Sequence, residues 1–240
     1  MTLISKAAGD LIIEQEVSSE AAYKAKYQRP ERPGGASGIT IGIGYDCGYS
    51  TPDQIRKDWG GRIPAGMVEV LAHRAAGLTG DNAQARLAEL KPQILVPWEA
   101  AISEFNDVEA PRWVSKVKNY LPNTEMLHPD SLGAIVSLTY NRGPSFNNSG
   151  DRYAEMRAIK AAMIAKRFAD IPAQFRSMKR IWAGNPSMRG LLNRREQEAK
   201  LFERGLTSPK QAQAVATVNA PSAPPPSLWG RFTDLFGKGA

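Results

Sequence analysis

The chain has 240 residues, 42% hydrophobic and 23% charged, so its composition is that of an ordinary globular protein with one sizeable core. No stretch approaches the ~20 consecutive apolar residues that span a bilayer, and the first residues lack the basic, apolar and cleavage-site regions of a signal peptide. We therefore expect synthesis in the cytoplasm without export by a signal peptide.

The net charge of +7 favours an anionic partner, which can be a nucleic acid, an acidic membrane or an acidic polysaccharide. A single cysteine, Cys47, excludes an intramolecular disulfide and any site built from several cysteines. With only two histidines, His73 and His128, a zinc site is disfavoured as well. We expect no cofactor and no metal.

The first predicted helix begins after Ser5, a good N-cap residue, and runs to about Val17. Glu16 lies at the rim of its apolar face, whereas Glu14 points away from that face. The residues that share this face are Ile4, Ala8, Leu11 and Ile12.

Residues 28–38 are rich in proline and glycine and are predicted to form a loop. The isoleucines Ile39, Ile41 and Ile43 then alternate with small or polar residues, which predicts a short strand in a small hairpin or sheet. Only this part of the chain has a strand pattern, so the fold class is α+β.

After Thr51 the sequence is helical in character up to residue 204. The predicted helices cover roughly residues 52–59, 64–76, 81–91, 97–108, 112–120, 129–141, 151–167, 170–178 and 187–204.

Two segments follow the helices. Residues 207–226 have the Ala- and Pro-rich composition of a linker, and residues 227–240 form a short amphipathic segment. Its apolar residues fall on one face of a helix: Leu228, Trp229, Phe232, Leu235 and Phe236. We consider three roles for this stripe, which are membrane contact, binding to a partner protein, and packing back on the enzyme.

The order of Glu16, Tyr23 and a TIGIG run from Thr40 to Gly44 resembles the phage-type lysozymes, or endolysins. Two later segments are similar to that family too: LTYNRG at 138–143 and GLxxRRxxExxLF at 190–202. The resemblance implies a lysozyme-like catalytic domain over residues 1–206, with a small N-terminal β-sheet region and a larger, mostly helical lobe.

Many phage-type lysozymes carry a second acidic or cysteine residue nine positions after the glutamate, where this chain has Ala25. Instead, Asp46 follows Thr40 by six positions in a TIGIGYD run, as in the pesticin-like branch of muramidases. By this resemblance the catalytic residues are Glu16, Thr40 and Asp46.

These residue types suit the cleavage of a glycosidic bond, which needs a proton for the leaving oxygen and a second polar group at the reacting carbon. Glu16 is the predicted general acid and Asp46 the base that activates a water oriented by Thr40. The resemblance implies a muramidase that cleaves between N-acetylmuramic acid and N-acetylglucosamine in bacterial peptidoglycan and so lyses cells. We expect a monomer, made in the host cytoplasm and acting on the cell wall after release.

Further residues are predicted to bind substrate. Tyr45, Asn141 and Arg142 are assigned to this role, with capping and turn formation as the alternative for Asn141 and Arg142. Arg194 and Arg195 are either glycan contacts or solvated charges, and Cys47 is expected to be a small apolar residue. Three tryptophans either stack on sugars or belong to the core: Trp98, Trp113 and Trp182.

Two other functions stay open. A lytic transglycosylase would use Glu16 alone and release a 1,6-anhydro product instead of a reducing end. A wall-binding or membrane-disrupting protein would act through residues 227–240 and need no catalytic pair. Nucleic-acid binding is disfavoured, because the basic residues are spread along the chain and no recognition motif is present.

Overall fold

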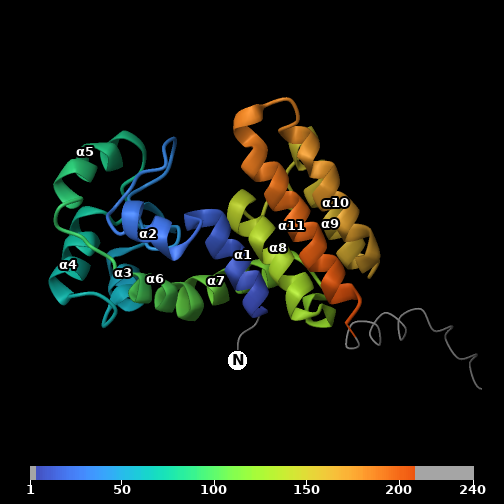
Figure 1. Cartoon of the computed structure of the whole chain (residues 1–240), viewed down its shortest axis with the longest axis horizontal. Coiled ribbons are helices and arrows are strands. Elements are labelled where there is room, and N and C mark those ends of the chain that lie inside the picture. Colours follow the sequence, from blue (N-terminus) through green and yellow to red (C-terminus); the bar gives the residue numbers. More distant parts are fainter. Residues whose placement is uncertain (1–3, 209–240) are drawn as a thin grey trace, which may run out of the picture.

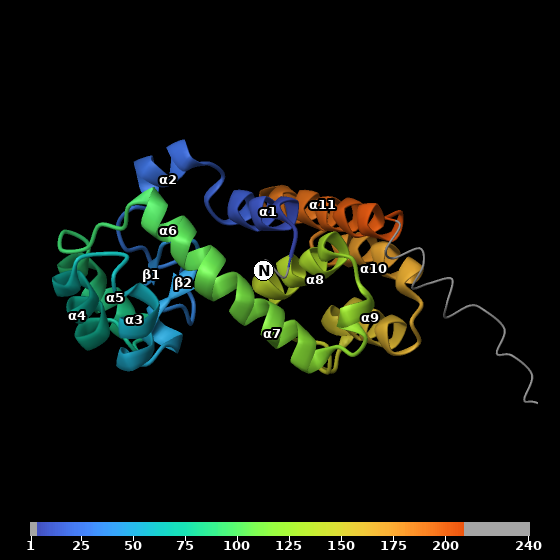
Figure 2. The ribbon, with the colours of Figure 1, turned by 90° about the horizontal axis from the view of Figure 1, so that it is seen from below.

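The computed structural model describes residues 4–208, so most of the predicted linker and the whole amphipathic tail, which fall in residues 209–240, lie outside the described residues. The described part of the chain is mostly helical and contains one small antiparallel sheet, so the predicted α+β class is confirmed. Figure 1 shows two lobes, one with α2 to α5 and one with α8 to α11, and Figure 2 shows the helical run from α6 to α7 joining them.

The helices of the first lobe and of the connection largely follow the predicted segments. Their bounds are α1 Lys6–Val17, α2 Glu20–Lys26, α3 Pro52–Trp59, α4 Ala65–Arg74, α5 Gly80–Leu90, α6 Trp98–Glu104 and α7 Ala110–Tyr120. The Ser5 side chain accepts from the N–H of Ala8, so the predicted cap of α1 is confirmed. Helix α2 was not predicted, although Ser19 caps it in the same way.

The second lobe is built around α8, Pro129–Arg142, in which every residue from Asp130 to Thr139 is buried. Around it lie α9 Ala154–Ile164, α10 Ile171–Ser177 and α11 Arg189–Leu206. Helix α1 packs on α8 so closely that a Cβ added at Gly133 would lie 2.1 Å from the Cβ of Ala8. Because α11 also packs on α8, the end of the described chain is held next to its beginning.

The two helices predicted at 97–108 and 112–120 are one continuous helical run, with a π-helical turn at Phe105–Glu109 between α6 and α7. The gap between the two predicted helices contains Pro111, a residue that has no N–H to donate. In the structure Pro111 sits in the first turn of α7, where its missing N–H costs little, and the wider π turn precedes it. The connection between the lobes therefore contains no loop.

The sheet consists of β1 Thr40–Ile41 and β2 Tyr45–Asp46, paired with Thr40 opposite Asp46 and Ile41 opposite Tyr45. The predicted strand through Ile43 is wrong at its end, because Gly42 and Gly44 adopt φ of 59° and 77° and turn the chain there. The alternation of isoleucines reflects burial instead: Ile39, Ile41 and Ile43 are all part of the core.

Candidate functional site

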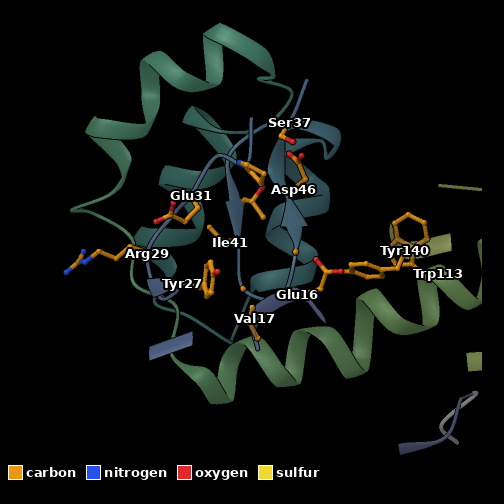
Figure 3. A pocket seen from close by; sticks show the side chains of 14 residues that line it. Glu16, Val17, Tyr27, Arg29, Glu31, Ser37, Ile41, Asp46, Trp113 and Tyr140 are labelled. Atoms are coloured by element: carbon orange, nitrogen blue, oxygen red, sulfur yellow. The ribbon is translucent and has the colours of Figure 1, made fainter. Parts of the chain in front are cut away.

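The predicted catalytic residues Glu16, Thr40 and Asp46 line one pocket of about 280 Å³. They come from the end of α1, from β1 and from β2, so the fold brings together positions that are up to 30 residues apart in the sequence. Figure 3 shows Asp46 at the upper end of the strands and Glu16 below them, near Tyr140. The structure thus places the three residues together, while their catalytic roles stay predictions.

Glu16 is held by an ion pair with a distant arginine. The Arg194 Nη1 lies 2.8 Å from Glu16 Oε1, and the Glu16 side chain is 25% exposed. Arg194 is itself buried and also donates to the carbonyl of Ser137 at 3.0 Å and to Glu198 at 3.3 Å. One guanidinium therefore fixes the end of α1 against α8 and α11.

Glu198 completes this network at the centre of the second lobe. Its Oε1 accepts from the Ser137 hydroxyl at 2.7 Å and from Arg195 Nη2 at 2.7 Å. Burial raises the pKa of Glu198, and it lowers that of Arg195 to about 10. Neither interpretation of Arg194 and Arg195 from the sequence is correct, since both are buried structural ions and neither a glycan contact nor a solvated charge.

Thr40 occupies the middle of a row of three residues that runs across the strands. On one side its N–H and carbonyl both pair with the backbone of Glu31, at 2.8 and 3.0 Å, and on the other side it lies opposite Asp46. Side chains of directly paired residues point to the same face of a sheet. Glu31, Thr40 and Asp46 therefore share one face, and all three line the pocket.

Asp46 is fixed by the backbone around it. Its carboxylate accepts from the N–H of Gly38 at 3.1 Å and from the N–H of Gly48 at 2.8 Å. Partial burial raises the pKa of Asp46 above its ordinary value, and these two N–H groups oppose that effect. Gly38 must be a glycine here, because a Cβ would lie 2.4 Å from Asp46 Oδ1 and 2.6 Å from the Gly48 backbone.

The three predicted substrate-binding residues are not part of the pocket. Tyr45 is only 1% exposed and its hydroxyl donates to Asp58, so it belongs to the core beneath the sheet. Asn141 is exposed at the end of α8 but does not line the pocket. Arg142 donates to the carbonyl of Arg152 and lies over the ring of Trp182 on another side of the lobe.

Aromatic residues that the sequence did not single out as a pair form one end of the pocket. Trp113 and Tyr140 have ring centroids 5.0 Å apart, and the Tyr140 hydroxyl donates to the carbonyl of Ile43 at 2.6 Å. Of the three tryptophans considered, only Trp113 lines the pocket. Cys47 is buried as expected, and burial raises the pKa of its thiol, so it is no nucleophile.

Among residues 4–208 no group of three His, Cys, Asp or Glu side chains is arranged to hold a metal ion. In the same residues no helix has the length and apolarity needed to span a membrane. The sequence matches no model of a known protein family and no curated protein.

Proposed function

We propose that the protein is a glycosidase that acts on bacterial peptidoglycan and cleaves between N-acetylmuramic acid and N-acetylglucosamine, as the phage-type lysozymes that it resembles do. The observation that carries the proposal is the position of Glu16 in the same pocket as the Thr40–Asp46 strand pair. Acidic groups from separate elements on one concave site are the arrangement that glycoside cleavage requires.

In the proposed reaction, Glu16 gives a proton to the leaving oxygen while a water attacks the anomeric carbon. Arg194 binds only Oε1 of Glu16 and is shared with Glu198, which leaves Oε2 to carry the proton. Asp46 removes a proton from the water, and its raised pKa makes it a stronger base once it is ionised. Thr40, directly opposite Asp46, orients the water through its hydroxyl.

The second carboxyl group favours hydrolysis over a lytic transglycosylase reaction, which needs Glu16 alone. The net charge of +7 supports attraction to an anionic wall.

The proposal is tested with Glu16→Gln, which keeps the shape of the side chain but cannot supply the proton. We expect this variant to fold normally and to release no reducing ends from purified peptidoglycan, while the wild-type protein does. Mass spectrometry of the soluble fragments then distinguishes the two reactions. Reducing ends indicate hydrolysis, whereas 1,6-anhydro ends would show that the protein is a lytic transglycosylase. Normal turnover by Glu16→Gln would refute the assignment of the site.

A further inference from the structure

Glu31 lines the pocket, but neither the resemblance nor the proposed reaction gives it a role. Its side chain is 40% exposed, and one carboxylate oxygen, Oε1, is 2.8 Å from Lys91 Nζ. Asp46, at the other end of the same row, already accepts hydrogen bonds from the backbone N–H groups of Gly38 and Gly48. Glu31 is therefore the carboxylate of this row that is best placed to meet a ligand.

The spacing between the strands indicates that the carboxylates of Glu31 and Asp46 have different roles. Neighbouring strands lie about 4.8 Å apart, so Glu31 and Asp46, each one strand away from Thr40, stand roughly 10 Å apart along the row. At that separation the two carboxylates do not act together on a single water molecule. A bound polymer would contact them with different parts of its chain.

The wall around Glu31 is polar and well anchored. Arg29, which also lines the pocket, donates to the carbonyls of Lys91 and Pro92 at the end of α5, at 2.9 and 3.3 Å. Figure 3 shows Arg29 and Glu31 on one side of the pocket and Trp113 and Tyr140 on the other, beside Glu16. The pocket thus has a charged end and an aromatic end.

We infer that Glu31 is a substrate-binding residue, which accepts a hydrogen bond from a hydroxyl or acetamido N–H group of a sugar next to the cleaved bond. The inference rests on the proposed function, because it takes the bound polymer to be a glycan strand. Glu31 and the Thr40–Asp46 pair then bind successive parts of that strand, and the aromatic rings pack on the sugars at the far end.

The test uses the full chain with Glu31→Ala and Glu31→Gln, and purified peptidoglycan at a range of concentrations. The expected result is a KM about tenfold higher for Glu31→Ala, the size of one hydrogen bond to a charged group, with kcat within about threefold. Glu20→Ala is the matched control, because Glu20 is also an exposed glutamate paired with a lysine, Lys24. We expect the control to keep the wild-type KM.

Lys91→Met separates substrate binding from a structural role of the ion pair. It breaks the same contact between the loop and α5 but leaves the Glu31 carboxylate in the pocket, so the KM should rise much less than in Glu31→Ala. An equal rise in both variants would overturn the inference, and so would a wild-type KM in Glu31→Ala and Glu31→Gln. Circular dichroism shows whether each variant is folded, and Glu31→Gln keeps the side-chain volume if Glu31→Ala does not fold.

A binding experiment distinguishes failure of this inference from failure of the proposed function. Calorimetry with a GlcNAc–MurNAc tetrasaccharide compares Glu16→Gln with the double variant Glu16→Gln/Glu31→Ala. Weaker binding by the double variant supports the inference. Equal binding by two inactive proteins would refute only the role of Glu31, whereas normal hydrolysis by Glu16→Gln would refute the proposed function.

Discussion

The most consequential single contact in the site is the one between Glu16 and Arg194, because it ties the predicted acid to a buried cation. Arg194 bridges three acceptors with its planar guanidinium: Glu16, Glu198 and the Ser137 carbonyl. A lysine ammonium carries the same charge but lacks the fork that reaches all three in fixed directions.

We therefore expect Arg194→Lys to lower both stability and activity. The free energy of unfolding should fall by about 2 kcal/mol or more, since buried polar partners lose their hydrogen bonds. The kcat on peptidoglycan should fall more than tenfold, because Glu16 is no longer held in place. Urea unfolding and reducing-end assays measure the two effects, and a folded variant with wild-type kcat would contradict the importance of this contact for the site.

At the scale of single residues, the sequence allowed predictions only where a short local motif points to a residue. Glu16 and Asp46 were assigned by the resemblance of short local motifs to those of the phage-type and pesticin-like lysozymes, and the structure places both in one pocket. Glu31 and Tyr140 were missed as members of the site, and Trp113 was only one of three tryptophans considered, because only the folded chain brings these residues there. Tyr45 was assigned wrongly because alternation along a two-residue strand does not tell which face is buried.

At the scale of elements, the turn between β1 and β2 joins the two lobes. A Cβ at Gly44 would lie 2.8 Å from the Tyr140 hydroxyl, which belongs to α8 of the other lobe. The positive φ at Gly42 and Gly44 closes the turn, and the missing side chain of Gly44 lets Tyr140 reach the Ile43 carbonyl.

Gly44→Ala should therefore be more harmful than an alanine at an equally strained but open position. Gly61 has the same φ of 77° and nothing within 4 Å of the added Cβ, so Gly61→Ala is the matched control. Both variants carry the backbone strain of about 1–2 kcal/mol, and Gly44→Ala should cost a further ~1–3 kcal/mol because of the clash with Tyr140. Equal losses of unfolding free energy in the two variants would contradict the contact between the lobes.

Helix positions were predictable from caps and apolar spacing, as Ser5 before α1 illustrates. The continuity of α6 with α7 was not predictable, because Pro111 is a strong stop signal when neighbouring residues are read alone. Whether the helical run continues through Pro111 depends on the π turn before it, and a pattern of apolar residues does not reveal that turn.

At the scale of the whole molecule, that continuous helical run carries a buried and unpaired acid. Glu104 is fully buried, and neither of its oxygens has a hydrogen-bond partner among the described residues. Burial raises the pKa of Glu104 to about 9, and the nearby acids Glu109 and Asp58 add to the effect, against Arg112 and Arg62. The folded protein thus keeps a proton there that the unfolded chain releases near pH 4.5.

A raised acid pKa stabilises the fold at low pH, and this stability is lost as the pH rises from about 4.5 to about 9. At pH 7 the cost relative to pH 4.5 is on the order of 3 kcal/mol. Glu104→Gln has no proton to lose, so its stability should depend much less on pH over this interval. Urea unfolding at pH 5, 7 and 9 measures the slopes, with Glu20→Gln as the control. Parallel curves for Glu104→Gln and the wild type would contradict the burial of Glu104 in its protonated form.

The pairing of Glu16 with Arg194 joins residues 178 positions apart. On the ribosome, Glu16 emerges long before α11 has been made, so the growing chain lacks the cation that orients it. An incomplete product that ends before Arg194 would carry the whole TIGIGYD run and still have an unassembled site. The predicted site is therefore complete only in a chain that has been made through α11.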